Sequence, residues 1–365
     1  MYKHFKAPLL RGFFLSLILL IQTSVFAVEL NQHQDGVLWY SVSSDSYSEA
    51  MTIMDIFEDN PESISKGEII YSYSQWQIGY QLNEYVGFGL IRGLDLYAEH
   101  SPDAARIYYA DNVDNQELEE RRYNYQLEGD MQRTQGLFIT FSRKVKGLSI
   151  YTMLEAGQAF GLTSIDIDGD LNYQDGQLVG SADIDYFYEK DALYKREVDS
   201  AQGKYWSVSL KLKHSSLLGK HELTIKDLFN QTYWSSAPYT HVLLNTDRVA
   251  TTDENGNISF RPLGSGIETY KSKTQIFPSR IDLRNYLEIN DKAEMILGVK
   301  SISDNVWPYL GFAASKFNLN LTYHINEQSL ALYHKVNSNV LYQLEVDQAD
   351  IEEMQRIQFG LEISY

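Results

Sequence analysis

Three aspartates at alternate positions are the part of this sequence that most resembles a metal-binding motif. Asp166, Asp168 and Asp170 resemble the opening of a calcium-binding loop of the EF-hand type. That loop needs glycine at its sixth position and glutamate at its twelfth, where this chain has Leu171 and Gln177. We therefore predict one acidic face of an exposed strand, and neither a metal site nor a cofactor. Weak calcium bridging by acidic loops remains the alternative.

Histidine and serine occur together at three places, as a hydrolase would need. The pairs are His100-Ser101 and His214-Ser215, and His241 follows Ser235-Ser236. A nucleophile and its base must lie within hydrogen-bond reach, whereas neighbouring side chains on a strand point to opposite faces. None of the three has a recognisable catalytic setting, so we assign no catalytic residue. The chain has no cysteine, which excludes thiolate chemistry and disulfides.

The first 27 residues have the pattern of a secretory signal peptide. Three basic residues precede an apolar run of about ten, which is shorter than a membrane-spanning helix requires. Cleavage after Ala27 leaves 28 Lys+Arg (31 − 3) against 49 Asp+Glu, a net charge of −21. This acidic balance argues against nucleic acid or anionic lipid head groups as partners, because both need a basic face.

Strict alternation of apolar and polar residues recurs along the chain and predicts β-strands. The clearest segments are Gln75–Leu82, Trp206–Lys213, Ile281–Ile289 and Phe317–His324. No later apolar run reaches the length of a spanning helix. If the chain sits in a membrane, it must therefore do so as a closed barrel, in which every backbone polar group is paired.

The last strand is the most informative segment. Phe359, Leu361, Ile363 and Tyr365 alternate with polar or small residues up to the final position. This ending resembles the C-terminal assembly signal of Gram-negative outer-membrane β-barrel proteins, although Phe is the commoner last residue there. The resemblance covers about ten residues. It implies an all-β, antiparallel transmembrane barrel in the outer membrane, in contact with its lipid and lipopolysaccharide and recognised by the barrel-assembly machinery through the last strand.

Short and long connections alternate, as periplasmic turns and extracellular loops do. We predict short turns at Asn83-Glu84, Arg143–Lys146, Leu217–Lys220, Asn290-Asp291 and Asn326–Gln328, and long acidic connections at 99–133, 161–203 and 234–277. Counting back from Tyr365 gives eleven strands, and a twelfth within 37–57 makes the number even. Ten or fourteen strands are the alternatives, since residues 28–66 are hard to parse. We predict one barrel domain over 28–365, with strands protruding above the membrane in the long connections.

Strand parity sorts wall residues from residues that face the lumen. If apolar positions face lipid, a mixed set of charges faces inward: Asp95, Glu155, Lys211, Lys213, Glu222, Lys226, Asp282, Arg284, Glu288, Glu294 and Lys300. Such charges either pair to fill a narrow barrel or line a channel that selects a solute. Arg92 and Asp227 break parity, which predicts a β-bulge or a strand that has left the membrane.

Three functions are compatible with this pattern. The first is a narrow porin-like channel for small polar solutes, with Lys211, Arg284 and Glu294 as the leading lumen residues. The second is a closed barrel acting as a surface, adhesion or structural protein through its long acidic loops. The third is a rim-sited hydrolase of outer-membrane lipid or lipopolysaccharide, for which His100 is the best-placed base.

Overall fold

A computed structural model describes residues 36–58, 64–65, 67–112, 118–174, 177–191, 197–216, 219–246, 250–252, 258–260 and 264–365. The predicted signal peptide lies outside these residues. The helices are α2 (Ile53–Glu58) and α3 (Pro102–Asn112), with short 3-10 turns η1 (Ser315–Phe317) and η2 (Ile351–Glu353). The strands are β1 (Val37–Ser48), β2 (Ile69–Gln81), β3 (Val86–His100), β4 (Arg122–Val145), β5 (Leu148–Gln174), β6 (Gln177–Tyr188), β7 (Gly203–Ser216), β8 (Gly219–Asn245), β9 (Ala250–Thr252), β10 (Ile258–Phe260), β11 (Gly264–Gln275), β12 (Arg280–Asn290), β13 (Ala293–Ile302), β14 (Asn305–Ala314), β15 (Leu319–His324), β16 (Ser329–Lys335), β17 (Val340–Val346) and β18 (Arg356–Ser364).

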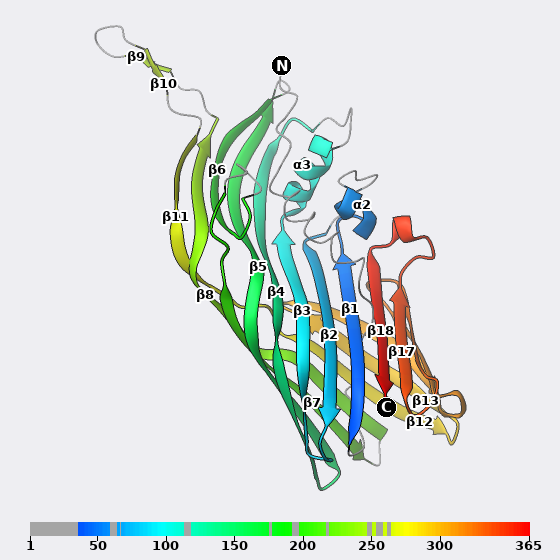
Figure 1. The fold of residues 1–365 in the computed structure, drawn as a ribbon. Coiled ribbons are helices and arrows are strands. Elements are labelled where there is room, and N and C mark those ends of the chain that lie inside the picture. The colour runs from blue at the N-terminus through cyan, green and yellow to red at the C-terminus, as the bar shows by residue number, and fades with distance from the viewer. Residues whose placement is uncertain are drawn as a thin grey trace.

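Fourteen of these strands form a closed antiparallel barrel (Figure 1). The order round the barrel is β1, β2, β3, β4, β5, β7, β8 and then β12 to β18. The barrel closes where β1 pairs with β18, from Trp39 opposite Ser364 to Tyr47 opposite Arg356. The predicted all-β transmembrane barrel is therefore confirmed, with fourteen strands rather than about twelve.

The two additional strands come from the last third of the chain, where one predicted turn was wrong. Asn326–Gln328 joins β15 to β16 at the end of the barrel opposite the C-terminus, not at the periplasmic end. The predicted strand Phe317–His324 begins only at Leu319, because η1 ends in a turn at Asn318, whose φ is +48°, and β14 precedes η1 as a separate strand. β15, β16 and β17 have only 6, 7 and 7 residues. Strands this short carry too few alternations for the pattern to mark each one.

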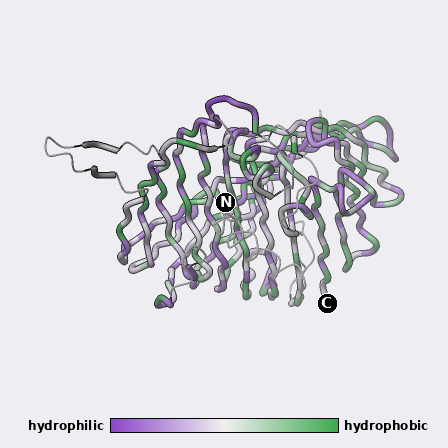
Figure 2. The backbone as a smooth tube through the Cα atoms, turned by 90° about the horizontal axis from the view of Figure 1, so that it is seen from above, coloured by the Kyte–Doolittle hydropathy of each residue, from purple (hydrophilic) through white to green (hydrophobic). Residues whose placement is uncertain are grey.

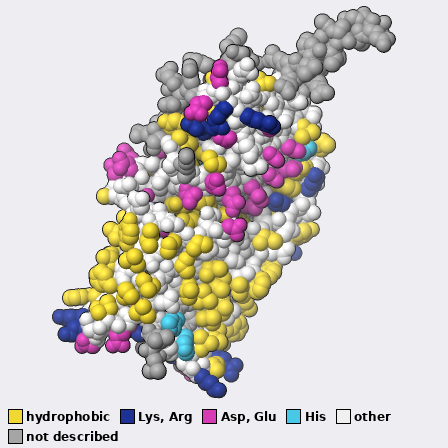
Figure 3. Space-filling view, turned by 180° about the vertical axis from the view of Figure 1, so that it is seen from behind, with side chains coloured by type: hydrophobic (Ala, Val, Ile, Leu, Met, Phe, Trp, Pro, Cys, Tyr) yellow, Lys and Arg dark blue, Asp and Glu magenta, His cyan; other side chains and the backbone are white. Residues whose placement is uncertain are grey.

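Apolar side chains face outward over the lower part of the barrel. On β4, Leu137 is 64% exposed and Ile139 and Phe141 are also exposed, whereas Phe138 and Thr140, which point inward, are buried. Figure 3 shows apolar side chains covering the lower half of the molecule, and Figure 2 shows hydrophobic and hydrophilic positions alternating along the strands. A continuous apolar belt on a closed antiparallel barrel is the surface that an outer-membrane protein presents to lipid.

The barrel wall is much taller on one side than on the other (Figure 1). We call β4, β5, β6, β8 and β11 the tall wall, in which β4, β5 and β8 have 24, 27 and 27 residues. These lengths exceed the roughly 9–11 residues of a spanning strand, so the predicted protruding strands are confirmed. We call β13 to β18 the short wall. The β9–β10 hairpin stands away from the barrel beyond the tall wall (Figures 1 and 2).

A β-bulge changes the side-chain pattern of the tall wall as it rises. Met131 lies opposite Thr163 but Arg133 lies opposite Phe160, so β5 holds one extra residue at this level. Gly161, with φ of +70°, occupies the bulge. One extra residue exchanges the two faces of a strand. Above the bulge Asp166 therefore shares a face with lumen-facing positions of β4, and Ile167 turns outward.

The outer face of the wall is covered near the top. Leu94, Leu96 and Met131 form a buried cluster with Ala105 and Tyr108 of α3. The two helices lie near the upper ends of β1 to β4 (Figure 1). Among the described residues, no helix is long and apolar enough to cross a membrane.

Candidate functional site: the barrel lumen and its mouth

The short wall holds a buried network of charges on its inner face. Arg356 pairs with Asp45, lies 3.0 Å from the Glu345 carboxylate and 3.4 Å from that of Glu327, and is fully buried. Lys300 donates to Glu345 at 2.8 Å. Buried charges are tolerated only when they are paired and hydrogen-bonded. The network therefore fixes these strands to one another across the lumen side of the wall.

His324 completes this network. Its Nδ1 lies 3.2 Å from Glu327 and 3.6 Å from Glu345, and all three side chains are buried. A histidine with two glutamates has the composition of a metal site. Here, however, Arg356 and Lys300 already supply two positive charges to the same carboxylates. We therefore read the group as an ion-pair network.

A second charged group lies at mid-height beside the tall wall. Arg280 pairs with Asp227, and its guanidinium lies 3.9 Å from the centroid of the Tyr73 ring. Asp227 has φ of +54° and sits where the pairing of β7 with β8 shifts register, and it also accepts a hydrogen bond from Ser207 at 2.7 Å. The bulge predicted at Asp227 is confirmed, and it directs the carboxylate inward. Arg92 is exposed beside Trp76 within the regular register of β2 and β3, so there is no bulge at that position and the other alternative, a strand that has left the membrane, stays a prediction.

Aromatic side chains cross the lumen between the two charged groups. Trp307 of β14 lies with its ring centroid 5.8 Å from that of Tyr47 and 6.1 Å from that of Tyr71. These residues form one buried cluster with Tyr73 and Phe277. Tyr71, Tyr73 and Trp307 are each 2% exposed, whereas side chains lining an open aqueous pore would be wetted. The lumen is therefore closed at this level.

Two cavities with charged side chains in their lining meet at Arg280. The larger, of about 160 Å³, is lined by Asp45, Lys226, Asp282, Arg284 and Lys300 among others. The smaller, of about 30 Å³, is lined by Asp95, Glu155, Asp227 and Gln132 among others. Tyr73 and Arg280 line both cavities. Because these two side chains line both cavities, they form the partition between them. Each cavity has room and polar partners for water.

The structure places the predicted lumen residues as follows. Asp95 accepts a hydrogen bond from Gln132 at 3.2 Å, and Glu155 accepts one from Gln75 at 3.5 Å. Glu222 lies 3.6 Å from Lys211 and 3.0 Å from Lys213. The other contacts are Asp282–Arg284 at 2.7 Å, Glu294–Lys220 at 2.7 Å and Lys300–Glu345 at 2.8 Å, while Lys226 lines the larger cavity and Glu288 is exposed near the turn after β12.

Sequence reasoning missed five residues that these networks depend on: Asp45, Arg280, Glu327, Glu345 and Arg356. Arg280 and Arg356 each lie two residues before an inward-facing residue, Asp282 and Gln358 respectively. Extending each predicted strand by two residues would therefore have placed both arginines in the lumen. Glu327 fell in the misplaced turn, and no strand was predicted at Glu345.

The inner face of the tall wall forms an acidic surface above the lumen. Directly opposite partners run across five strands, from Glu99 to Glu128, Asp166, Asp185 and His241. A second row places Asp168 opposite Asp183. Acidic side chains gather above the apolar belt in Figure 3. Like charges directly opposite each other are destabilising. Burial, and then the neighbouring carboxylates led by Asp185, raises the pKa of Asp166.

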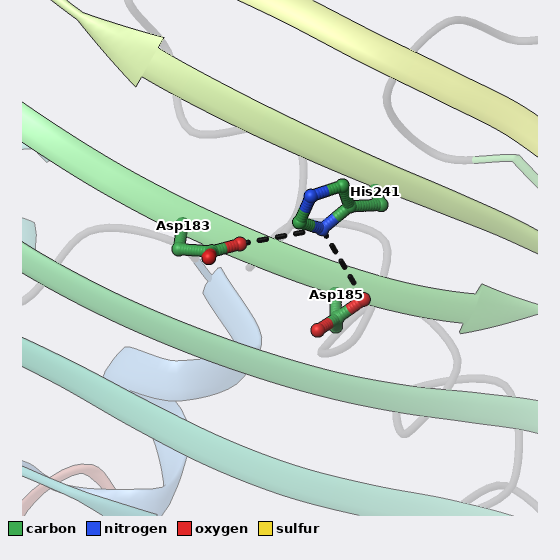
Figure 4. A group of neighbouring side chains, drawn as sticks. All are labelled: Asp183, Asp185 and His241. Carbon is green, nitrogen blue, oxygen red and sulfur yellow. Dashed lines mark ion pairs between the residues drawn. The ribbon is translucent and has the colours of Figure 1, made fainter.

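His241 lies against two of these carboxylates (Figure 4). Its Nδ1 is 3.3 Å from Asp183 and 3.4 Å from Asp185, which also accepts a hydrogen bond from Tyr239. Of the tall wall's lysines, Lys271 lies 3.7 Å above the ring of Tyr239 and Lys273 lies 5.2 Å from that of Phe187.

The histidine–serine pairs make structural contacts. The Ser101 hydroxyl accepts a hydrogen bond from the backbone of Ala104 at 3.1 Å, so it caps the start of α3. His100 is buried, and burial lowers its pKa. His214 instead stacks on His221, with ring centroids 6.4 Å apart.

No protein-family model and no curated protein sequence matches the chain. Among solved structures, it is similar to the toluene transporter TbuX of Ralstonia pickettii, at 10% identity and a TM-score of 0.44, covering 94% of each chain. The toluene transporter TodX of P. putida gives 8% identity and a TM-score of 0.37, again over 94% of each chain. A ferric enterobactin receptor mutant of Pseudomonas aeruginosa gives 7% and 0.23, over 92% of this chain and 82% of that one.

Proposed function

We propose that the protein is a gated outer-membrane channel for small polar solutes whose acidic mouth favours cations. The observation that carries the proposal is the pair of cavities, each lined in part by charged side chains, that meet at Tyr73 and Arg280 inside the barrel. A barrel that served only as a scaffold could bury apolar side chains at this level at lower cost, because buried charges need partners. The charged walls instead provide binding positions for a polar solute or ion.

The gate in this proposal is the partition itself. Arg280 is held by Asp227 on one side and by the ring of Tyr73 on the other. A rotation of the Arg280 side chain away from Tyr73 joins the two cavities without moving a strand. The rows of carboxylates on the tall wall stand above this point and raise the local concentration of cations.

The apolar belt and the closed barrel support a location in the outer membrane. They agree with the C-terminal alternation, whose members Phe359, Leu361 and Ile363 are partly exposed on β18 and whose last residue, Tyr365, is exposed. In this orientation the tall wall rises on the outer side, opposite the C-terminus.

Conductance across planar bilayers tests the channel. We expect the wild-type protein to show brief openings that favour cations, and Tyr73→Ala to lengthen or enlarge them because it removes one half of the partition. Asp166→Asn with Asp168→Asn should reduce the cation preference and leave opening unchanged. Arg122→Ala, on the rim in a pair with Asp170, is the control for gating. A folded barrel in which neither wild type nor Tyr73→Ala conducts would overturn the channel.

That negative outcome would favour a second function, a closed barrel that binds ligands at its surface. The aromatic cluster across the lumen and the acidic face of the tall wall are the observations behind it. Binding of a basic peptide to the intact protein, abolished by the same two aspartate substitutions and by high salt, would support this alternative.

A further inference from the structure

Asp183, Asp185 and His241 are held together by the strand register of the tall wall. Asp183 and Asp185 are two apart on β6 and therefore point to the same face. His241 of β8 lies directly opposite Asp185. Figure 4 shows both carboxylates directed at the imidazole. The three ligands thus come from two rigid, paired strands.

The two distances from the imidazole nitrogen to the carboxylates match the coordination shell of a small divalent metal, and all three ligand atoms lie within 4.8 Å of one another. Zinc binds histidine nitrogen and carboxylate oxygen at about 2.0–2.2 Å in tetrahedral geometry, which separates neighbouring ligand atoms by roughly 3.3–3.5 Å. Nδ1 of His241 lies 3.3 Å from an oxygen of Asp183 and 3.4 Å from one of Asp185. The atom is buried and has no hydrogen-bond partner among the described residues.

The carboxylates around this group outnumber the cations near them. Asp166 lies opposite Asp185 and Asp168 lies opposite Asp183. Among the described residues, none of these four carboxylates forms an ion pair with lysine or arginine, and Lys271 and Lys273 lie over aromatic rings. Lys273 acts on Asp166 without forming an ion pair, and no lysine or arginine pairs with Asp183 or Asp185 among the described residues. A divalent ion brings two positive charges and also occupies the position to which His241 Nδ1 is directed.

We propose that Asp183, Asp185 and His241 form a binding site for a borderline divalent transition metal, with Zn²⁺ as the reference ion, on the outer face of the cell. An imidazole with two carboxylates suits zinc and its neighbours, whereas calcium and magnesium prefer oxygen ligands alone. Because the two aspartates are 54% and 45% exposed, the fourth position opens to solvent and accepts water or a ligand group. This site is separate from the lumen and from the gate.

Titration calorimetry tests this site. It measures Zn²⁺ binding to the full-length protein in detergent micelles above neutral pH. We expect one Zn²⁺ per chain. Loss of a residue that only orients a ligand weakens metal binding roughly 10–100-fold. His241→Ala and Asp183→Asn each remove a ligand and should weaken Zn²⁺ binding by more than that. Co²⁺ in place of Zn²⁺ should give the visible spectrum of a tetrahedral ion in wild type and lose it in His241→Ala.

Two matched controls make the result specific. Asp170→Asn removes a carboxylate of β5 from the same face of the sheet as the proposed ligands. This carboxylate is paired with Arg122, so zinc affinity should not change. His221→Ala removes a histidine from the pair with His214 at the opposite end of the barrel. If zinc binding follows His221, is unchanged in His241→Ala, or is absent from wild type, the site is overturned. Wild-type conductance is measured separately, so failure of the channel and failure of the metal site remain distinguishable.

Discussion

The tall wall and the short wall place acidic side chains in opposite environments. On the short wall, Glu327 and Glu345 are buried, and Arg356, Lys300 and His324 meet them at close range. On the tall wall, Asp166, Asp168 and Asp183 are exposed in rows with no arginine or lysine ion pair among the described residues. The first arrangement holds strands together, whereas the second leaves negative charge available to something outside the chain.

Strand length explains the difference. Strands of 6 or 7 residues do not rise above the barrel, so their inward charges stay inside it and must be neutralised there. Strands of 27 residues continue into water, where the cost of an unpaired carboxylate is small. The buried charge of the short wall is therefore structural, and charge on the protruding sheet is free to serve binding.

The largest expected effect on stability comes from removing one arginine from each wall and comparing the two losses. Arg356→Met leaves three carboxylates without their buried cation and should lower the free energy of unfolding by about 3–5 kcal/mol. Arg122→Met removes an exposed pair with Asp170 on the tall wall and should cost at most about 1 kcal/mol. Urea titration of the refolded protein measures both. Equal losses would contradict the distinction between the walls.

A smaller effect should appear at the bulge that exchanges the faces of the tall wall. Gly161 has φ of +70°, which an L side chain adopts only at a cost of about 1–2 kcal/mol. We expect Gly161→Ala to lower the free energy of unfolding by that amount and to increase hydrogen exchange in β5 and β6. Gly169→Ala, on the same strand where an added Cβ would meet Ala182 at 3.3 Å, should cost less. The reverse order would show that the bulge is not strained.

The smallest effect concerns the unpaired carboxylates. Burial and the neighbouring carboxylates raise the pKa of Asp166 above its unfolded value, so the folded state binds this proton more tightly. The stability contributed by Asp166 is therefore fullest below the unfolded pKa and is lost as pH rises through the folded pKa. Asp166→Asn should remove this dependence and stabilise the sheet at neutral pH by about 0.2–1 kcal/mol. Hydrogen exchange of β5 as a function of pH measures it, and a stability that instead rises with pH would contradict it.

Much of the barrel could be predicted because lipid imposes a simple rule on each strand. The alternation from Ile357 to Tyr365 gave the correct faces, since Arg356 and Glu362 are buried on the inner side. The same rule predicted the protruding strands and the bulge at Asp227. It failed for β15 to β17, because a connection of four residues does not interrupt an alternating pattern clearly.

The sites were harder to predict because they depend on partners far apart in the chain. Asp45 and Arg356 are paired although they are separated by 311 positions. The Asp166–Asp170 motif drew attention to β5, but the group with metal-like spacing combines Asp183 and Asp185 of β6 with His241 of β8. Only the register of β6 against β8 brings these residues together, and sequence spacing alone does not give that register.

The pairing of β1 with β18 also governs how this chain can be made. Leu38 and Tyr365 exchange backbone hydrogen bonds of 3.2 and 2.8 Å, and nine further residues of β1 lie opposite β18, so β1 gains its second partner only after β18 has been made. A translation product that stops before β18 leaves β1 with an open row of amide and carbonyl groups, the feature that drives strand-to-strand aggregation. Closure of the barrel is thus read out as loss of an edge. A protease that recognises exposed edges would distinguish copies that lack β18 from closed barrels without recognising any particular sequence.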